Sequence, residues 1–220
     1  GKAHPYTLLM DAINTWRWSS FEYSKNFYLI DMTSPEGCVS NQIPQSGSIT
    51  FAIDTTEKRI EEQDIEDLQK KEEDVLTYQY VAEKTAKLDF HEITENKPTH
   101  VLSINDSYNI FGFLTHLSNG IYIPESMPRY HSSQNCATIT FKINDDGDKA
   151  SFDVSVYARS FNNKILDYLW KAILDDIARY FYSYGEEAVK YENLAYYDAW
   201  FPEEGTNMME DIIGDAYRSI

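Results

Sequence analysis

ATITFKINDDGDKASFDVSVYA, at residues 137–158, has the alternating pattern of a β-hairpin. Ile139, Phe141 and Ile143 alternate with polar residues, and Val154 and Val156 do so again after an Asp-Gly pair. Alternation with a period of two on both sides of such a turn is typical of two antiparallel strands with one buried face. The sequence therefore predicts a long hairpin here.

A strongly amphipathic segment follows this hairpin. From Asn162 or Asn163, either of which can cap a helix, apolar residues recur three and four positions apart as far as Ile177. Gly185 is suited to end this helix. Residues 186–200 and 206–218 are predicted to form two further helices.

The rest of the chain alternates between strand and helix patterns. Helices are predicted at 5–18 and 55–74, the second capped by Thr55 or Thr56, and strands at 25–32, 48–54, 76–83 and 99–105. Residues 108–120 are undecided between the two. The fold class is α+β: a mainly antiparallel sheet from the central region, packed against N-terminal and C-terminal helices. We expect one domain over 1–220, strand-rich over 25–158 and helical over 162–218.

Composition limits the classes of ligand. The chain has 220 residues, 42% of them hydrophobic, and a net charge of −17. Nucleic acids and anionic membranes are disfavoured, because binding to phosphates depends on clustered Lys and Arg. No apolar run reaches the roughly 20 residues that a spanning helix needs, so we expect a soluble chain without membrane insertion. No cofactor motif is present, and we expect none.

The two cysteines, Cys38 and Cys136, lie among small polar residues that are typical of loops. Two interpretations stay open. A disulfide between them would favour an extracytoplasmic location, whether periplasmic, cell-surface or secreted. Two unpaired thiols would carry no such implication.

The region from Tyr180 to Phe201 holds nine aromatic residues beside several carboxylates and a single cation, Lys190. Exposed Tyr and Trp side chains favour contacts with a protein or a small ligand. Helical periodicity places part of the cluster, including Tyr180, Phe181 and Leu194, in the core. The residues predicted to form a binding surface are Tyr184, Tyr191, Tyr197, Trp200, Glu187 and Asp198. The favoured function is a non-enzymatic interaction domain, with a partner that is a protein or a small ligand.

Two alternatives come from other functional classes. One is a hydrolase that uses carboxylates with His91, His116 or His131. The other is an acidic inhibitor or immunity-type protein, in which the acidic residues of 61–74 form one continuous face toward a basic partner.

Neither metal pattern in the sequence is persuasive. Residues 142–153 resemble a calcium loop, but Lys142 stands where the first carboxylate belongs, so an Asp-rich hairpin turn is favoured. The histidines between His91 and His131 lack zinc-ligand spacing. No metal ligands are predicted.

Overall fold

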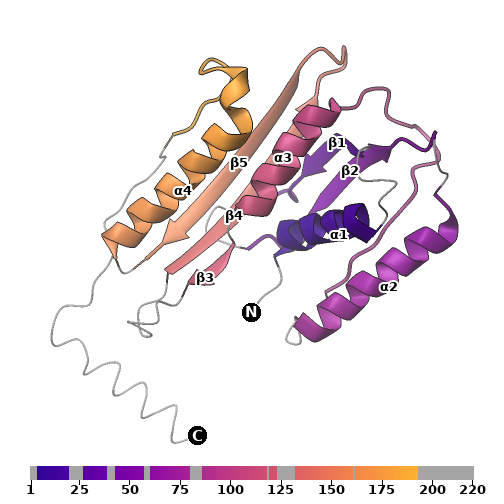
Figure 1. The fold of residues 1–220 in the computed structure, drawn as a ribbon, viewed down its shortest axis with the longest axis horizontal. Helices are drawn as coiled ribbons and strands as arrows, with labels where there is room; N and C mark the ends of the chain where they lie inside the picture. Colours follow the sequence, from indigo (N-terminus) through magenta and orange to yellow (C-terminus); the bar gives the residue numbers. More distant parts are fainter. Residues whose placement is uncertain are drawn as a thin grey trace, which may run out of the picture.

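The computed structural model describes residues 4–19, 27–38, 43–56, 60–79, 86–117, 119–122, 132–160 and 162–192. Figure 1 shows the arrangement of these parts. The helices are α1 (Pro5–Ser19), α2 (Glu62–Gln79), α3 (Ile104–His116) and α4 (Asn163–Phe181), with a short 3-10 turn η1 (Tyr182–Tyr184). The strands are β1 (Phe27–Thr33), β2 (Ser48–Ile53), β3 (Gly120–Tyr122), β4 (Ser132–Ile143) and β5 (Ala150–Arg159).

The strands form one antiparallel sheet around β4. Strands β1 and β3 pair with different parts of β4, β5 pairs with β4 along nearly its whole length, and β2 pairs with β1. The pairing register shifts between Cys136 and Thr138 in β4, and between Leu29 and Asp31 in β1. Such bulges bend a strand and re-aim its side chains.

The main core lies between the sheet and the helices. Leu29, Ile139 and Phe141 point inward from β1 and β4, where they meet Phe111 and Leu114 of α3. In Figure 1, α1, α3 and α4 lie side by side across the sheet, while α2 lies outermost beyond α1. The predicted α+β fold with a mainly antiparallel sheet is confirmed.

The hairpin at 137–158 is confirmed as β4 and β5. Ile139 pairs with Val154 and Phe141 with Phe152, which places the apolar residues of both strands against the core. Gly147 adopts a φ of 73° in the connecting turn, a conformation that favours glycine. The calcium-like stretch is therefore a strand-turn-strand unit, as favoured from the sequence.

The undecided segment at 108–120 belongs mainly to α3, and the strand predicted at 99–105 is wrong. Ser103 caps α3 by accepting a hydrogen bond from the Asp106 amide at 3.2 Å, and its hydroxyl donates to the Asp106 carboxylate at 2.7 Å. Only a single backbone bond, from the Leu102 amide to the Leu29 carbonyl, links the preceding stretch to β1. A local cap thus ends the extended pattern.

Helix α2 begins later and extends further than predicted. It starts at Glu62, so Thr55 and Thr56 do not cap it, and it continues to Gln79 through the first half of the strand predicted at 76–83. Leu68 and Leu76 are both buried, eight residues apart, so the apolar stripe of the helix extends beyond Asp74. Residues 80–83 lie outside the described part.

Helix α4 is confirmed, with Asn162 as its cap: its side chain accepts from the Lys164 amide at 2.9 Å. The helix predicted from Glu186 is wrong up to Glu192, because these residues form a turn followed by an irregular stretch. Gly185, at φ 79°, separates η1 from this turn. Residues 193–220, including the third predicted helix, lie outside the described ranges.

Within the described ranges, no helix is both long and apolar enough to cross a membrane. Helix α4 has 19 residues, but six of them are charged, three acidic and three basic.

A buried histidine immediately before α1 makes stability depend on pH. His4 Nε2 lies 2.9 Å from the Cys136 carbonyl and 3.1 Å from Asn135 Oδ1, so this nitrogen carries the proton and donates. His4 Nδ1 is buried without a hydrogen-bond partner among the described residues. Burial therefore lowers the His4 pKa below its ordinary value of 6.5.

We expect His4 to make the fold less stable in acid. As pH falls through 6.5, His4 becomes protonated in the unfolded chain but stays neutral in the folded chain. The unfolded state is thereby stabilised, so the free energy of unfolding falls. The loss is complete only below the lowered pKa of the folded state. Urea unfolding between about pH 5 and 8 should show this fall in the wild type.

His4→Gln is the matched control, because its amide keeps a donor for Cys136 but does not titrate. The stability difference between wild type and H4Q should therefore change with pH only below about 6.5. A constant difference across the range would contradict the assignment.

Candidate functional site

Helix α4 and the turn after it present an exposed set of tyrosines. Tyr168 is 69% exposed, Tyr182 87%, Tyr184 40% and Tyr191 58%. We call these four residues the tyrosine surface. Helix α4 buries only Leu169 completely, so much of its circumference faces outward at the side of the helix layer away from α1 (Figure 1).

Tyr168 lies on the outward side of α4, whereas Tyr182 is the first residue of η1, just beyond the C-terminal end of α4. Phe181 leaves helical geometry at φ −123° and ψ 4°, so the helical period of α4 does not set the direction of the Tyr182 side chain. Leu169, Ile173 and Ile177 occupy the opposite side, toward the core. Neither tyrosine has a hydrogen-bond partner in the described part of the chain. Neither was among the predicted binding residues, although the helical periodicity of α4 would have placed Tyr168 on the outside.

Tyr184 ties η1 to α3 and is only partly available for contacts. Its hydroxyl donates to Asp106 Oδ1 and accepts from Asn109 Nδ2 at 3.1 Å. Burial and the Asp106 carboxylate raise the Tyr184 pKa. These bonds anchor the hydroxyl of Tyr184, while the side chain remains 40% exposed.

Tyr191 lies beside α4 because the chain turns back after η1. Its ring is 6.1 Å from that of Trp170, with an interplanar angle of 65°. Glu187 is exposed in the intervening turn, as predicted for a polar rim. Tyr197, Asp198 and Trp200 lie outside the described residues. Tyr180 and Phe181, expected in the core, pack against it.

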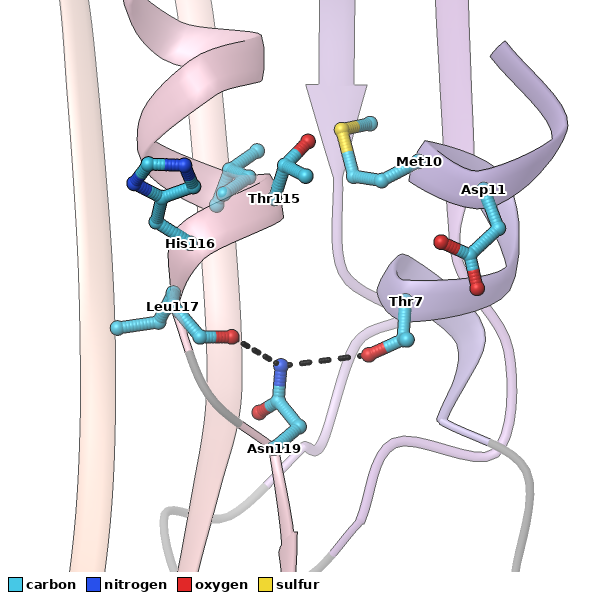
Figure 2. Close-up of a pocket in the computed structure, with 8 residues that line it drawn as sticks. Thr7, Met10, Asp11, Thr115, His116, Leu117 and Asn119 are labelled. Carbon is cyan, nitrogen blue, oxygen red and sulfur yellow. Dashed lines mark hydrogen bonds between the residues drawn. The ribbon is translucent and has the colours of Figure 1, made fainter. Parts of the chain in front are cut away.

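A separate pocket lies between α1 and α3. Its volume is about 130 Å³, and Figure 2 shows its lining. Asn119 Nδ2 donates to the Leu117 carbonyl at 3.1 Å and to Thr7 Oγ1 at 3.4 Å, and Asn119 Oδ1 accepts from the Cys136 amide at 2.6 Å. The lining residues are Thr7, Met10, Asp11, Leu114, Thr115, His116, Leu117 and Asn119.

This pocket lacks the features of an aromatic ligand site. It contains neither Tyr nor Trp, and the polar atoms of Asn119 are occupied by bonds that join α1, α3 and β4. Asp11 faces it with a carboxyl whose pKa is raised by burial. We therefore interpret the pocket as a gap at the packing interface of α1, α3 and β4, and not as a ligand-binding site.

His116 cross-links α3 to α4. Its Nδ1 lies 3.0 Å from Arg179 Nη1, 3.1 Å from Tyr180 Oη and 3.5 Å from Asp176 Oδ1. A guanidinium can only donate to Nδ1 and a carboxylate can only accept from it, so the contacts with Arg179 and Asp176 call for opposite roles of this nitrogen. Together the contacts hold the His116 ring against α4.

The other histidines do not assemble a metal site. His91 is exposed in an irregular stretch, His100 lies against the turn at Gly147, and His131 is outside the described residues. Among the residues that the structure describes, no three His, Cys, Asp or Glu side chains are grouped to hold a metal ion.

Cys38 and Cys136 are both free in the structure, which lends no support to the disulfide interpretation. Cys38 is half-buried, while Cys136 is buried beneath the bulge of β4. Burial raises the Cys136 pKa to about 12, so this thiol is an inert, core-forming side chain. The expectation of an extracytoplasmic location loses the disulfide on which it rested.

The acidic residues of α2 do not make one continuous face. At about 100° per residue, Glu62, Glu66 and Glu73 lie along one stripe and Asp67 and Asp74 along another. Lys70 projects between these stripes, and Lys71 flanks the second. The uninterrupted negative surface that the inhibitor alternative needs is therefore absent from the described face of α2.

No protein-family model matches this chain, and no curated protein sequence matches it either.

Proposed function

We propose that this protein is a non-enzymatic binding module that recognises a protein partner through the tyrosine surface. The observation that carries the proposal is the high exposure of Tyr168 on α4 and of Tyr182 in η1, directly after α4. Covering an exposed aromatic ring with a partner removes apolar surface from water, which favours binding. Tyr is enriched at such contacts.

A protein partner is favoured over a small ligand by shape. Drug-sized ligands are bound in concave sites that enclose most of their surface. The tyrosine surface lies on the outer side of a helix, and the pocket between α1 and α3 has no Tyr or Trp lining. An aromatic surface on the outside of a helix can be covered more completely by a protein partner than by a small ligand.

The charge of the chain favours a basic partner. The net charge is −17, and Glu186 and Glu187 are exposed in the turn beside the tyrosines. Arg side chains can pair with such carboxylates and stack on exposed rings. Binding should therefore weaken as salt concentration rises.

Replacing Tyr168 and Tyr182 together by serine is expected to abolish most binding. The test selects 12-residue peptides from a displayed random library against the wild-type protein. We expect the enriched peptides to be rich in Arg and Lys. Their affinity should fall by about tenfold or more in Y168S/Y182S, because each lost aromatic contact contributes about 1–2 kcal/mol.

Tyr78→Ser is the matched control. Tyr78 is 79% exposed, but it lies on α2, away from the tyrosine surface (Figure 1). Its replacement should leave peptide binding unchanged. Equal affinities in all three proteins, or equal losses in Y78S and Y168S/Y182S, would reject the tyrosine surface as the binding site.

A further inference from the structure

Helix α2 is attached to the rest of the protein by a narrow seam. Its inward stripe consists of Leu68, Glu72 and Leu76, each four residues from the next. Leu76 packs with Leu8 and Ala12 of α1 and with Leu88, in a small cluster apart from the main core. Glu72 thus occupies the middle of the stripe, where an apolar residue would be expected.

Glu72 is buried without full hydrogen bonding. Its side chain is only 2% exposed, and its Oε1 has no hydrogen-bond partner among the described residues. The Thr15 hydroxyl bonds the carboxyl group. An ionised carboxylate in this position is costly, because its charge is desolvated and one oxygen is unsatisfied.

The charges around Glu72 do not offset this cost. Asp11 of α1 repels the carboxylate, and Lys71 of α2 attracts it but projects into solvent. Lys87 and Asp89 flank Leu88, the remaining element of the seam, and both are exposed. A proton on Glu72 would remove both the repulsion from Asp11 and the desolvated charge.

We propose that α2 is an acid-closed arm: it docks firmly on α1 when the Glu72 carboxyl is protonated and opens when that carboxyl ionises. Opening uncovers Leu8 and Ala12 on the side of α1 that faces α2. This device is independent of the tyrosine surface on α4.

The direction of the pH effect follows from linkage. Burial, and next the Asp11 carboxylate, raise the Glu72 pKa above its ordinary value of 4.5 in the docked state. The docked form therefore holds a proton that the open form releases. Docking is strongest below pH 4.5 and weakens as pH rises through the raised pKa.

Hydrogen exchange of the full chain tests the arm. Protection factors, corrected for the intrinsic effect of pH, are measured between about pH 4.5 and 8. Protection of the α2 amides should fall about tenfold for each unit by which the docked pKa exceeds the open one. The amides of α4 serve as an internal reference and should not follow the same curve.

Glu72→Gln should remove the pH dependence of α2 protection, and the exposed neighbour variant Glu73→Gln should keep it. Asp11→Asn should raise α2 protection near pH 7 and reduce its pH dependence, because the repulsion is gone. If E72Q fails to fold, an NMR titration of the Glu72 carboxyl in the wild type tests the proposal instead, by measuring the Glu72 pKa. A pKa at or below 4.5, or the same pH dependence in E72Q and wild type, would overturn the proposal.

Discussion

Replacing Gly112 by alanine is expected to destabilise the protein by about 1–3 kcal/mol, in the direction opposite to helix propensity. In the interior of an exposed helix, the same change would stabilise by roughly 0.5–1 kcal/mol. The reason is that Gly112 lies where α3 and α4 approach each other. An added Cβ would lie 2.9 Å from Tyr180 Cζ and still closer to Cε1.

Tyr180 cannot give way cheaply. Its ring packs against the core, meets His116 edge-to-face at 5.4 Å, and its hydroxyl bonds His116 Nδ1 at 3.1 Å. Moving the ring would break this cross-link and shift α4, on which the tyrosine surface lies. G112A should therefore also weaken partner binding.

A double-mutant cycle with Tyr180→Ala isolates the clash. In the Y180A background, G112A should be neutral or slightly stabilising, because nothing is left for the new methyl group to meet. Chemical unfolding of the four proteins measures the coupling. A G112A destabilisation of the same size in both backgrounds would show that helix packing at Gly112 is not its cause.

Replacing Ser34 by alanine should cost about 2–4 kcal/mol, an unusually large effect for a half-buried serine. Ser34 Oγ accepts from the Ile139 amide at 2.7 Å and bonds Tyr6 Oη at 2.6 Å, and the Ser34 amide donates to the Ile139 carbonyl at 2.9 Å. The residue thus joins β1, the bulged region of β4 and α1. Alanine would leave the Ile139 amide and the Tyr6 hydroxyl buried and unpaired.

Tyr6→Phe separates the two bonds. Burial raises the Tyr6 pKa to about 12, so the hydroxyl is neutral, and its removal should cost about 1 kcal/mol. S34A and Y6F together should cost less than their sum, because each removes a partner of the other. Ser151→Ala, on the exposed part of β5, is the control and should change stability little. An S34A cost no larger than that of S151A would contradict the role of Ser34.

Local sequence patterns were sufficient to predict the elements in which hydrophobic periodicity and turn or cap residues indicate the same structure. The hairpin of β4 and β5 combines strict alternation with an Asp-Gly turn, and α4 combines a cap with a long apolar stripe. In both, the neighbouring sequence alone supplies turn, cap and buried face. This is why their bounds were predicted to within a few residues.

The predictions were wrong where contacts between residues far apart in the sequence determine the secondary structure. The stretch before α3 looked like a strand, yet the Ser103 cap and the sheet partners already used by β1 leave it unpaired apart from Leu102. The stretch at 76–79 alternates like a strand but continues the inward stripe of α2 across Glu72. A buried glutamate carries no hydrophobic signal, so the sequence concealed this stripe.

For the candidate site, the structure bears only on the exposure of the predicted side chains. Tyr191 and Glu187 are exposed as expected, whereas Tyr184 proves to be largely an anchor for α3 through Asp106. Tyr168 lies outside the dense aromatic stretch from which the binding residues were predicted, and Tyr182 lies within that stretch but was not among the predicted residues. The Asp106 bond could not be predicted, because it joins residues 78 positions apart.

Mapping the amide chemical-shift changes of the isotope-labelled protein during titration with a selected basic peptide tests whether the tyrosine surface is the binding site. We expect changes concentrated on the outward side of α4, at η1 and in the turn through Tyr191, lost in Y168S/Y182S and retained in Y78S. Changes confined to the pocket between α1 and α3, around Asp11 and His116, would contradict it.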